Sequence, residues 1–157
     1  MKKINIIIII FLLISSCTDN NNFNSNFFNN ILNKESPPFT ITELESKLAD
    51  TLLDFTFAGI SYSFLNKSEK DVSSITTSFM LFDAKTQSNP FIGSNIFEIK
   101  TLISISPREN MEIGISLDIF IYIAPSEPYL IDHFYISEIE YADGSIWRDK
   151  NGIYRIK

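Results

Sequence analysis

The sequence predicts a mostly β protein, an antiparallel sandwich of six to seven strands with one short N-terminal amphipathic helix. From Phe55 onward, apolar side chains alternate with polar ones at a period of two, which is typical of strands that bury one face. Turn residues interrupt this pattern at short intervals, which favours a sandwich or a barrel over alternating strands and helices. With 157 residues, of which 45% are hydrophobic and 20% charged, the chain suits one globular domain.

Residues 1–16 predict a secretory leader. Lys2 and Lys3 precede an apolar run over residues 6–14, and the small residues Ser15 and Ser16 follow it. As a helix this run would span about 13 Å, against a hydrocarbon core of roughly 30 Å. The run is therefore too short for a permanent membrane helix and suits a signal peptide that is cleaved.

The residues ISSC at 14–17 resemble the lipobox of bacterial lipoproteins, although Ile14 stands where leucine is commonest. The resemblance implies that Cys17 becomes the first residue of the mature chain and that its sulfur carries a diacylglycerol. Its amine usually carries a third acyl chain, and two or more chains anchor a protein stably. The alternative is an ordinary signal peptide with a chance cysteine. No base lies nearby in the sequence that would make Cys17 a nucleophile.

Residues 17–38 predict a disordered tether that begins at the lipidated cysteine. Asn, Ser, Asp and Pro dominate it, without the period of a helix or a strand. About 20 residues of coil give a root-mean-square span near 25 Å. Its apolar side chains either pack on the domain, reflect composition or contact a partner or membrane: Phe23, Phe27, Phe28, Ile31 and Leu32. The prolines at 37 and 38 mark the start of a β-sandwich domain over residues 39–157.

A short amphipathic helix is expected at about residues 43–53. Thr42 and Glu45 have the spacing of a capping box, which closes the first turn of a helix. Leu44, Leu48 and Leu52 then recur every four residues, which would place them on one apolar face.

Six or seven strands are expected after this helix. Their approximate ranges are 59–66, 75–82, 96–106, 111–123, 130–141, 145–149 and 153–156. The strongest pattern runs from Met111 to Ile123, where every second residue is apolar and would lie on one buried face. The residues between these ranges, such as 84–95 with Pro90 and Gly93, are expected to form loops and turns.

Residues 138–149 predict a β-hairpin around Asp143 and Gly144. A two-residue loop would place Trp147, the only tryptophan, opposite the charged Glu140. A three-residue loop over 142–144, with Gly144 in the left-handed conformation, gives better pairs and is favoured. The pairs expected from it are Trp147 with Ile139, Arg148 with Glu138 and Ile146 with Glu140.

The stretches ISYSFLNKSEKDVSSITTSFMLFD and IEYADGSIW resemble small immunoglobulin-like domains of bacterial envelope lipoproteins, which often finish with a Tyr-x-Asp-Gly-Thr/Ser-x-Trp hairpin. The leader and the Asn-rich tether look like those of spirochaetal lipoproteins. The resemblance covers about residues 55–149 and implies an immunoglobulin-like sandwich. The spacing of the strands by itself leaves a small open barrel as the alternative. It implies no particular activity.

One candidate binding patch lies on the hairpin. The patch consists of four residues that lie close in sequence: Tyr141, Asp143, Trp147 and Arg148. Tyrosine, tryptophan and arginine are the residue types most frequent at binding hot spots. The structural interpretation is that Trp147 plugs the end of the sandwich while Asp143 and Gly144 only make the turn, and it is favoured.

Catalysis, metal binding and nucleic-acid binding are not expected. One cysteine and His133, the only histidine, cannot form a Cys/His zinc site, and no nucleophile motif or calcium loop is present. Asp132 precedes His133, but adjacent side chains on a strand point to opposite faces. A net charge of −6 disfavours nucleic acid and anionic lipid. We expect no cofactor, no metal and no catalytic residue.

These observations together predict a lipid-anchored protein of the cell envelope that is not an enzyme. It would act as an interaction or structural module for an unknown protein partner, at the outer membrane, on the periplasmic or the surface side. The alternative is a carrier for a small apolar ligand, with a cavity between the sheets of roughly 300 Å³ or more.

Overall fold

The structure is a computed structural model, and it describes residues 36–156. The predicted signal peptide, the lipidated Cys17 and nearly all of the predicted tether lie outside the described residues. Residues from Pro37 onward form one compact unit.

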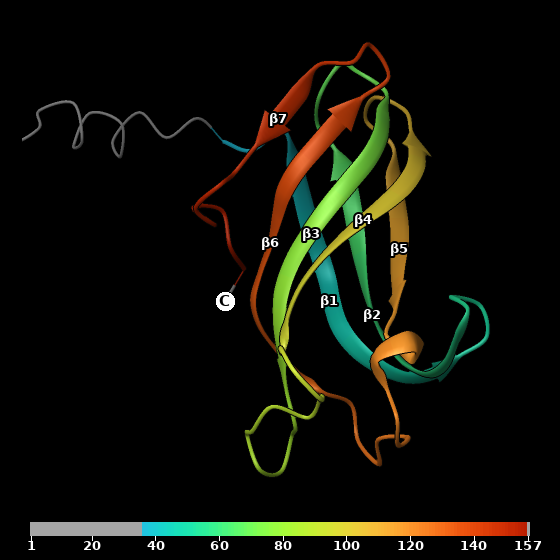
Figure 1. Cartoon of the computed structure of the whole chain (residues 1–157). Helices are drawn as coiled ribbons and strands as arrows, with labels where there is room; N and C mark the ends of the chain where they lie inside the picture. Colours follow the sequence, from blue (N-terminus) through green and yellow to red (C-terminus); the bar gives the residue numbers. More distant parts are fainter. Residues whose placement is uncertain (1–35, 157) are drawn as a thin grey trace, which may run out of the picture. The chain divides into compact units, whose positions relative to one another are not determined.

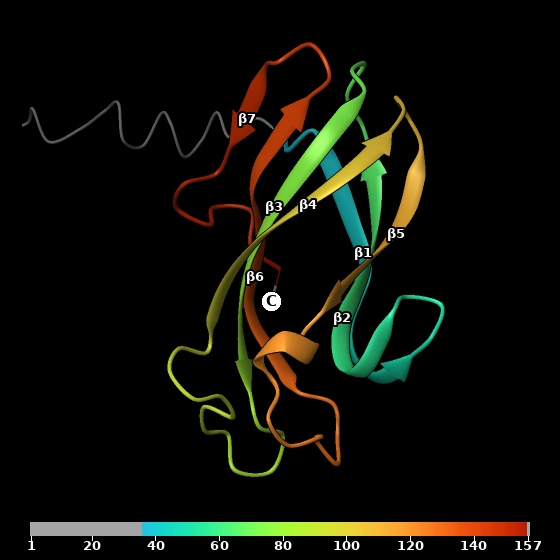
Figure 2. The same cartoon turned by 45° about the vertical axis from the view of Figure 1, so that its right-hand side comes forward.

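Seven strands form two antiparallel sheets that pack as a sandwich (Figures 1 and 2). The first sheet has the order β1-β2-β5, and its strands are β1 (Phe39–Asp50), β2 (Phe55–Asn66) and β5 (Asn110–Ser116). The second has the order β4-β3-β6-β7, and its strands are β3 (Val72–Phe82), β4 (Ile96–Ile105), β6 (Leu130–Tyr141) and β7 (Ile146–Arg148). The predicted mostly β, antiparallel sandwich is confirmed.

Alternating side chains of both sheets fill the space between them. Tyr62 of β2 packs edge-on against Phe134 of β6, with ring centroids 5.1 Å apart. Phe79 of β3 stacks on Phe134, with ring centroids 6.3 Å apart. Phe97 of β4 extends this row, 5.3 Å from Phe79. The Tyr62 hydroxyl, in the middle of the core, hydrogen-bonds the Thr77 hydroxyl at 2.9 Å and so joins the two sheets.

The helix expected at 43–53 is wrong, because these residues belong to strand β1 and to the turn after it. Leu44 and Leu48 share the inner face of β1, since a spacing of four residues places side chains on one face of a strand as well as of a helix. The register of β1 against β2 shifts between Thr42 and Glu45, which is a β-bulge. This bulge moves the inward positions from odd residues such as Ile41 to even ones, so no simple alternation marked the strand.

The prediction of a single strand over 111–123 is also wrong for the residues after 116. β5 ends at Ser116, and a 3₁₀ turn, η1 (Asp118–Phe120), follows. The Asp118 carboxylate accepts backbone N–H groups at the start of β2, from Thr56 at 2.6 Å, Phe57 at 2.8 Å and Ala58 at 3.3 Å. Desolvation acts to raise the pKa of Asp118, but these amides outweigh it and hold the pKa below its ordinary value.

The C-terminal predictions are confirmed in part. The register of β6 against β7 is that of the three-residue loop, with Ile139 opposite Trp147, and Gly144 has a positive φ of 80°. The remaining pairs, Glu138 with Arg148 and Glu140 with Ile146, are also as expected. The last expected strand, 153–156, is reduced to one isolated bridge between Ile156 and Phe134.

Candidate functional site

The residues of the predicted hairpin patch do not share one surface. Tyr141 is buried, and Trp147 packs inward, with its ring 5.3 Å from Phe39 and 5.8 Å from Tyr154. Arg148 lies on the opposite face of the sheet, where its Nε donates to Glu138 Oε2 at 2.7 Å. These contacts give Trp147 the packing role that the structural interpretation predicted.

Asp143, the remaining residue of that patch, connects the β6–β7 loop to the β2–β3 turn. Its carboxylate lies 2.8 Å from Lys70 Nζ and accepts hydrogen bonds from the hydroxyl and the amide of Ser145. The bond from Lys70, followed by those from Ser145, holds the pKa of Asp143 well below its usual range. The group is therefore a charged, exposed loop contact, and its carboxylate is unsuited to act as a general acid.

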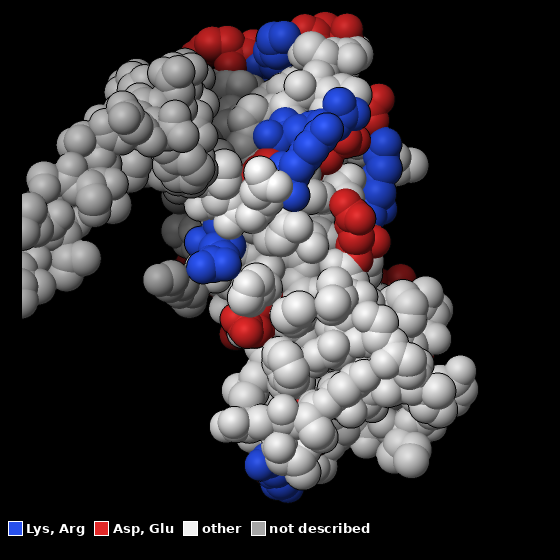
Figure 3. Space-filling view, turned by 60° about the vertical axis from the view of Figure 1, so that its left-hand side comes forward, with Lys and Arg blue, Asp and Glu red and all other residues white. Residues whose placement is uncertain are grey.

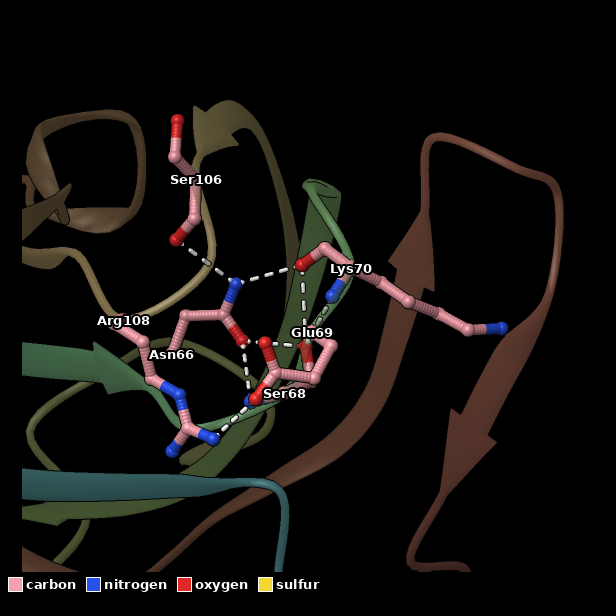
Figure 4. Close-up of polar contacts among 6 residues, drawn as sticks. All are labelled: Asn66, Ser68, Glu69, Lys70, Ser106 and Arg108. Atoms are coloured by element: carbon pink, nitrogen blue, oxygen red, sulfur yellow. Dashed lines mark hydrogen bonds and ion pairs between the residues drawn. The ribbon is translucent and has the colours of Figure 1, made fainter.

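Asn66 is the most heavily hydrogen-bonded polar side chain at the same end of the sandwich (Figure 4). It is almost fully buried at the end of β2. Its Nδ2 donates to the carbonyls of Lys70 at 2.8 Å, Ser106 at 3.0 Å and Ile105 at 3.3 Å. Its Oδ1 accepts from the amide and the hydroxyl of Ser68. Asn66 therefore joins the β2–β3 turn to the β4–β5 turn, and all its polar atoms serve the fold.

An ion pair between Arg108 and Glu69 lies beside Asn66 and joins the same two turns (Figure 4). Both side chains are exposed, so the pair contributes little to stability.

His133 contacts Asp132, contrary to the expectation for adjacent residues of a strand, because the register of β6 against β3 shifts at these residues. His133 has a positive φ of 51° inside a β-bulge, and its Nδ1 lies 3.4 Å from Asp132 Oδ1. Both side chains are exposed, and Arg155 lies 3.4 Å from the other ring nitrogen. In residues 36–156 no three His, Cys, Asp or Glu side chains gather in a way that could hold a metal ion.

One end of the sandwich is apolar and exposed. It is formed by the β1–β2 turn, the β3–β4 loop and the β5–β6 connection, which lie together at the bottom of Figure 1. We define the apolar tip as four side chains of these loops with their exposed fractions: Ile92 83%, Ile119 85%, Tyr122 80% and Ile123 85%. In Figure 3 charged side chains gather over the upper part of the domain, and the lower part carries few.

The apolar tip is a continuous surface and not a scatter of single side chains. Ile92 and Tyr122 line two shallow hollows, one of about 90 Å³ that also includes Ile119 and one of about 150 Å³ that also includes Ile123. Contiguous exposed apolar surface on a soluble domain is typical of an interaction site. Sequence reasoning missed it because residues 119–123 were expected to lie in a buried strand.

A groove runs along the open side of the sandwich, between the edge of β1 and the first half of β6. Its volume is about 480 Å³, and it is open to solvent. The apolar side chains at its floor are Ile41, Leu44, Ile131, Phe134 and Ile156. Three acidic side chains line it as well, and no basic one does: Glu43, Glu45 and Asp132.

Comparison of the chain with protein-family models, with curated proteins and with solved structures found no match. Within residues 36–156, the chain forms no helix with the length and hydropathy needed to cross a membrane.

Proposed function

We propose that this chain is a lipid-anchored protein of the bacterial cell envelope whose domain acts as a non-catalytic protein-interaction module. The observation that carries the proposal is the apolar tip, which exposes Ile92, Ile119, Tyr122 and Ile123 on one surface. Leaving such side chains in water is unfavourable, and a partner that covers them gains about 25 cal/mol for each Å² buried.

We further propose that the domain is immunoglobulin-like. Its first, second and fifth strands share one sheet, while its third, sixth and seventh share the other. Strands A, B and E and strands C, F and G divide in this way in immunoglobulin domains. The fourth strand here pairs with β3, whereas in the constant-type domain it joins the A-B-E sheet. The loops that bind antigen in variable domains include B–C and F–G, which correspond here to the β2–β3 and β6–β7 loops, at the end of the sandwich away from the apolar tip.

The described part of the chain enters the domain at the end that does not carry the apolar tip. β1 begins at Phe39, at the end that holds the β2–β3 turn, and runs for 12 residues toward the apolar end. A strand of this length spans about 40 Å. Residues 36–38 therefore join the domain about one strand length away from the tip.

A protein partner suits this tip better than a lipid surface does. The net charge of −6 opposes approach to anionic lipid. The two loops that carry the tip, residues 83–95 and 117–129, contain a single basic residue, Lys85, which pairs with Glu127 at 3.0 Å. A carrier of small apolar ligands has less support, because aromatic side chains fill the core and the groove is open and lined by three acids.

Photo-crosslinking in intact cells tests the interaction. We expect a photoreactive residue at Ile119 or Tyr122 to yield one discrete protein adduct. The same residue at Leu102, which is 80% exposed on the outer face of β4, serves as the matched control. Replacing Ile92 and Ile123 by lysine should remove the adduct while leaving the unfolding midpoint unchanged. An adduct with lipid alone, or equal adducts from Leu102, would contradict the proposal.

Detergent phase partitioning tests the anchor. We expect the native chain in the detergent phase and Cys17→Ala in the aqueous phase, because the acyl chains supply about 0.8 kcal/mol for each buried methylene. Incorporation of radiolabelled palmitate should be lost in the same variant. Persistent partitioning of Cys17→Ala into detergent would defeat the proposed anchor.

A further inference from the structure

We propose that the groove between β1 and β6 binds a short, extended, basic segment of a partner protein, which adds as a strand to the free edge of β1. This site is separate from the apolar tip, and its support is independent of it. Addition of a strand satisfies backbone groups of the edge, while pockets for alternate side chains give the specificity.

The edge of β1 offers free backbone groups to the groove. Among the strands of residues 36–156, β1 pairs with β2 only. The Lys67 amide donates to the Pro38 carbonyl at 2.8 Å, which marks these two residues as a hydrogen-bonded pair. Because such pairs alternate along an antiparallel ladder, Thr40 and Thr42 face β2, and Ile41 directs its N–H and C=O to the free edge.

The opposite wall of the groove is the part of β6 that β7 does not reach. β7 pairs only with residues 138–140 of β6, and Ile156 forms one bridge with Phe134. In the described part of the chain, no strand pairs with the outer edge of β6 over residues 130–133. The sandwich is therefore open on this side over residues 130–133, about a third of the length of β6.

Both ends of the groove are closed. At one end the Tyr129 amide donates to Ser46 Oγ at 3.1 Å, which connects the two walls. At the other end lies Ile156, held by its bridge to Phe134. The β1 residues between these limits, 41–46, span about 20 Å, which suits a peptide of roughly six residues.

The charge of the groove points to a basic segment. Glu45 already pairs with Lys47 at 3.0 Å. Glu43 and Asp132 are exposed and stand on opposite walls, and Lys and Arg are absent from the lining. Arg155 lies near His133 beside the groove, so the acidic character is strongest toward Glu43. A segment that alternates aliphatic residues with lysine or arginine would match the apolar floor and the acidic walls together.

The bulges argue for a short peptide over a second copy of this chain. Glu43 and His133 both have positive φ, 55° and 51°, inside irregular stretches of β1 and β6. A bulge interrupts the regular ladder that two long edges need in order to pair. A short peptide has no bulge of its own and can adapt to the one in β1, whereas β1 of a second copy brings the same interruption.

Fluorescence anisotropy of the whole chain in detergent micelles tests this site. The probe is a labelled, end-capped heptapeptide in which valine alternates with lysine. We expect saturable binding that weakens as salt is added. Two control peptides should bind at least about tenfold more weakly: one with glutamate in place of lysine, and one with alternate backbone amides methylated so that they cannot donate.

Protein variants locate the binding. We expect Glu43→Lys to weaken binding of the probe about fivefold to tenfold. Asp71→Lys makes an equal charge change in the exposed turn between β2 and β3, outside the groove, and should leave binding unchanged. The tip variant with lysine at positions 92 and 123 should bind the probe normally, so the two proposals fail separately. Circular dichroism verifies that each variant is folded.

Several results would overturn the inference. They are absence of saturable binding, equal affinity for the methylated peptide, and equal weakening by Asp71→Lys. A concentration-dependent dimer that Glu43→Lys abolishes and the probe does not displace would instead identify a second copy as the occupant.

Discussion

Asn66 shows how one residue can hold several turns in place. It stands at the end of β2, where its buried side chain lies between two turns and donates to carbonyls of both. An asparagine amide supplies two N–H donors and an acceptor in one plane, which no apolar residue can replace. The sequence placed Asn66 at the end of an alternating run but gave no sign of its role, because its partners at 105 and 106 lie some 40 residues away.

We predict that Asn66→Ala lowers the free energy of unfolding by about 2 to 3 kcal/mol, since it leaves buried carbonyls without a donor. Ser68→Ala, which removes one hydroxyl partner of Asn66 and leaves its three carbonyl contacts, should cost about 1 kcal/mol. Urea unfolding followed by tryptophan fluorescence measures both. Equal effects of the two variants would show that the amide donors contribute little.

At the scale of elements, glycines allow an aromatic ring to lie flat on the outer face of the first sheet. Phe55 is buried although it lies on that outer face, and its ring covers Gly59 of its own strand and Gly114 of β5. A Cβ at Gly59 would lie 2.5 Å from the Phe55 ring, which no side chain tolerates without movement. The ring therefore seals the start of β2 only because these positions lack side chains.

Gly59→Ala is predicted to destabilise the domain by about 1 to 3 kcal/mol, because the added methyl displaces the Phe55 ring. Adding Phe55→Leu should relieve the overlap, so the double variant loses less than the sum of the single ones. Thermal unfolding of the four proteins of this cycle measures the coupling. Additive effects would mean that the methyl disturbs something other than the ring.

At the scale of the whole molecule, the Tyr62–Thr77 hydrogen bond is a polar connection between the two sheets inside the core. Burial raises the pKa of the Tyr62 phenol well above its ordinary value, against a smaller effect of the bond from Thr77. The neutral phenol is thus the form that the folded state requires. Its contribution to stability is complete below the ordinary pKa of 10 and falls as pH rises above it.

Tyr62→Phe should cost about 1 kcal/mol at pH 7, where it leaves the Thr77 hydroxyl without its partner. Above pH 10 the native protein should lose up to about 1.4 kcal/mol for each pH unit through this group, and the variant should not. The two stabilities are therefore expected to converge and cross as the pH rises. Urea unfolding between pH 7 and pH 11.5 measures this, and parallel curves would contradict it.

The sequence by itself determined the features that depend on neighbours along the chain. Alternation at a period of two identified six of the seven strands, because a strand that buries one face needs only this pattern. The hairpin register followed from the turn chemistry of Asp143 and Gly144, which acts within a few residues. Trp147 was correctly given a packing role for the same reason, since its pairing with Ile139 fixed the face on which it lies.

The tertiary structure alone decided which segments meet. The leucines of β1 fit a helix and a strand equally well, and only the partner β2 and the bulge between Thr42 and Glu45 selected the strand. β5 ends at Ser116 although apolar alternation continues, and the Asp118 carboxylate that follows it binds amides some 60 residues away. That early end exposes Ile119 and Ile123, and the short β7 leaves the groove open. Both candidate surfaces therefore arise where long-range contacts overrule the local pattern, which is why the sequence could not reveal them.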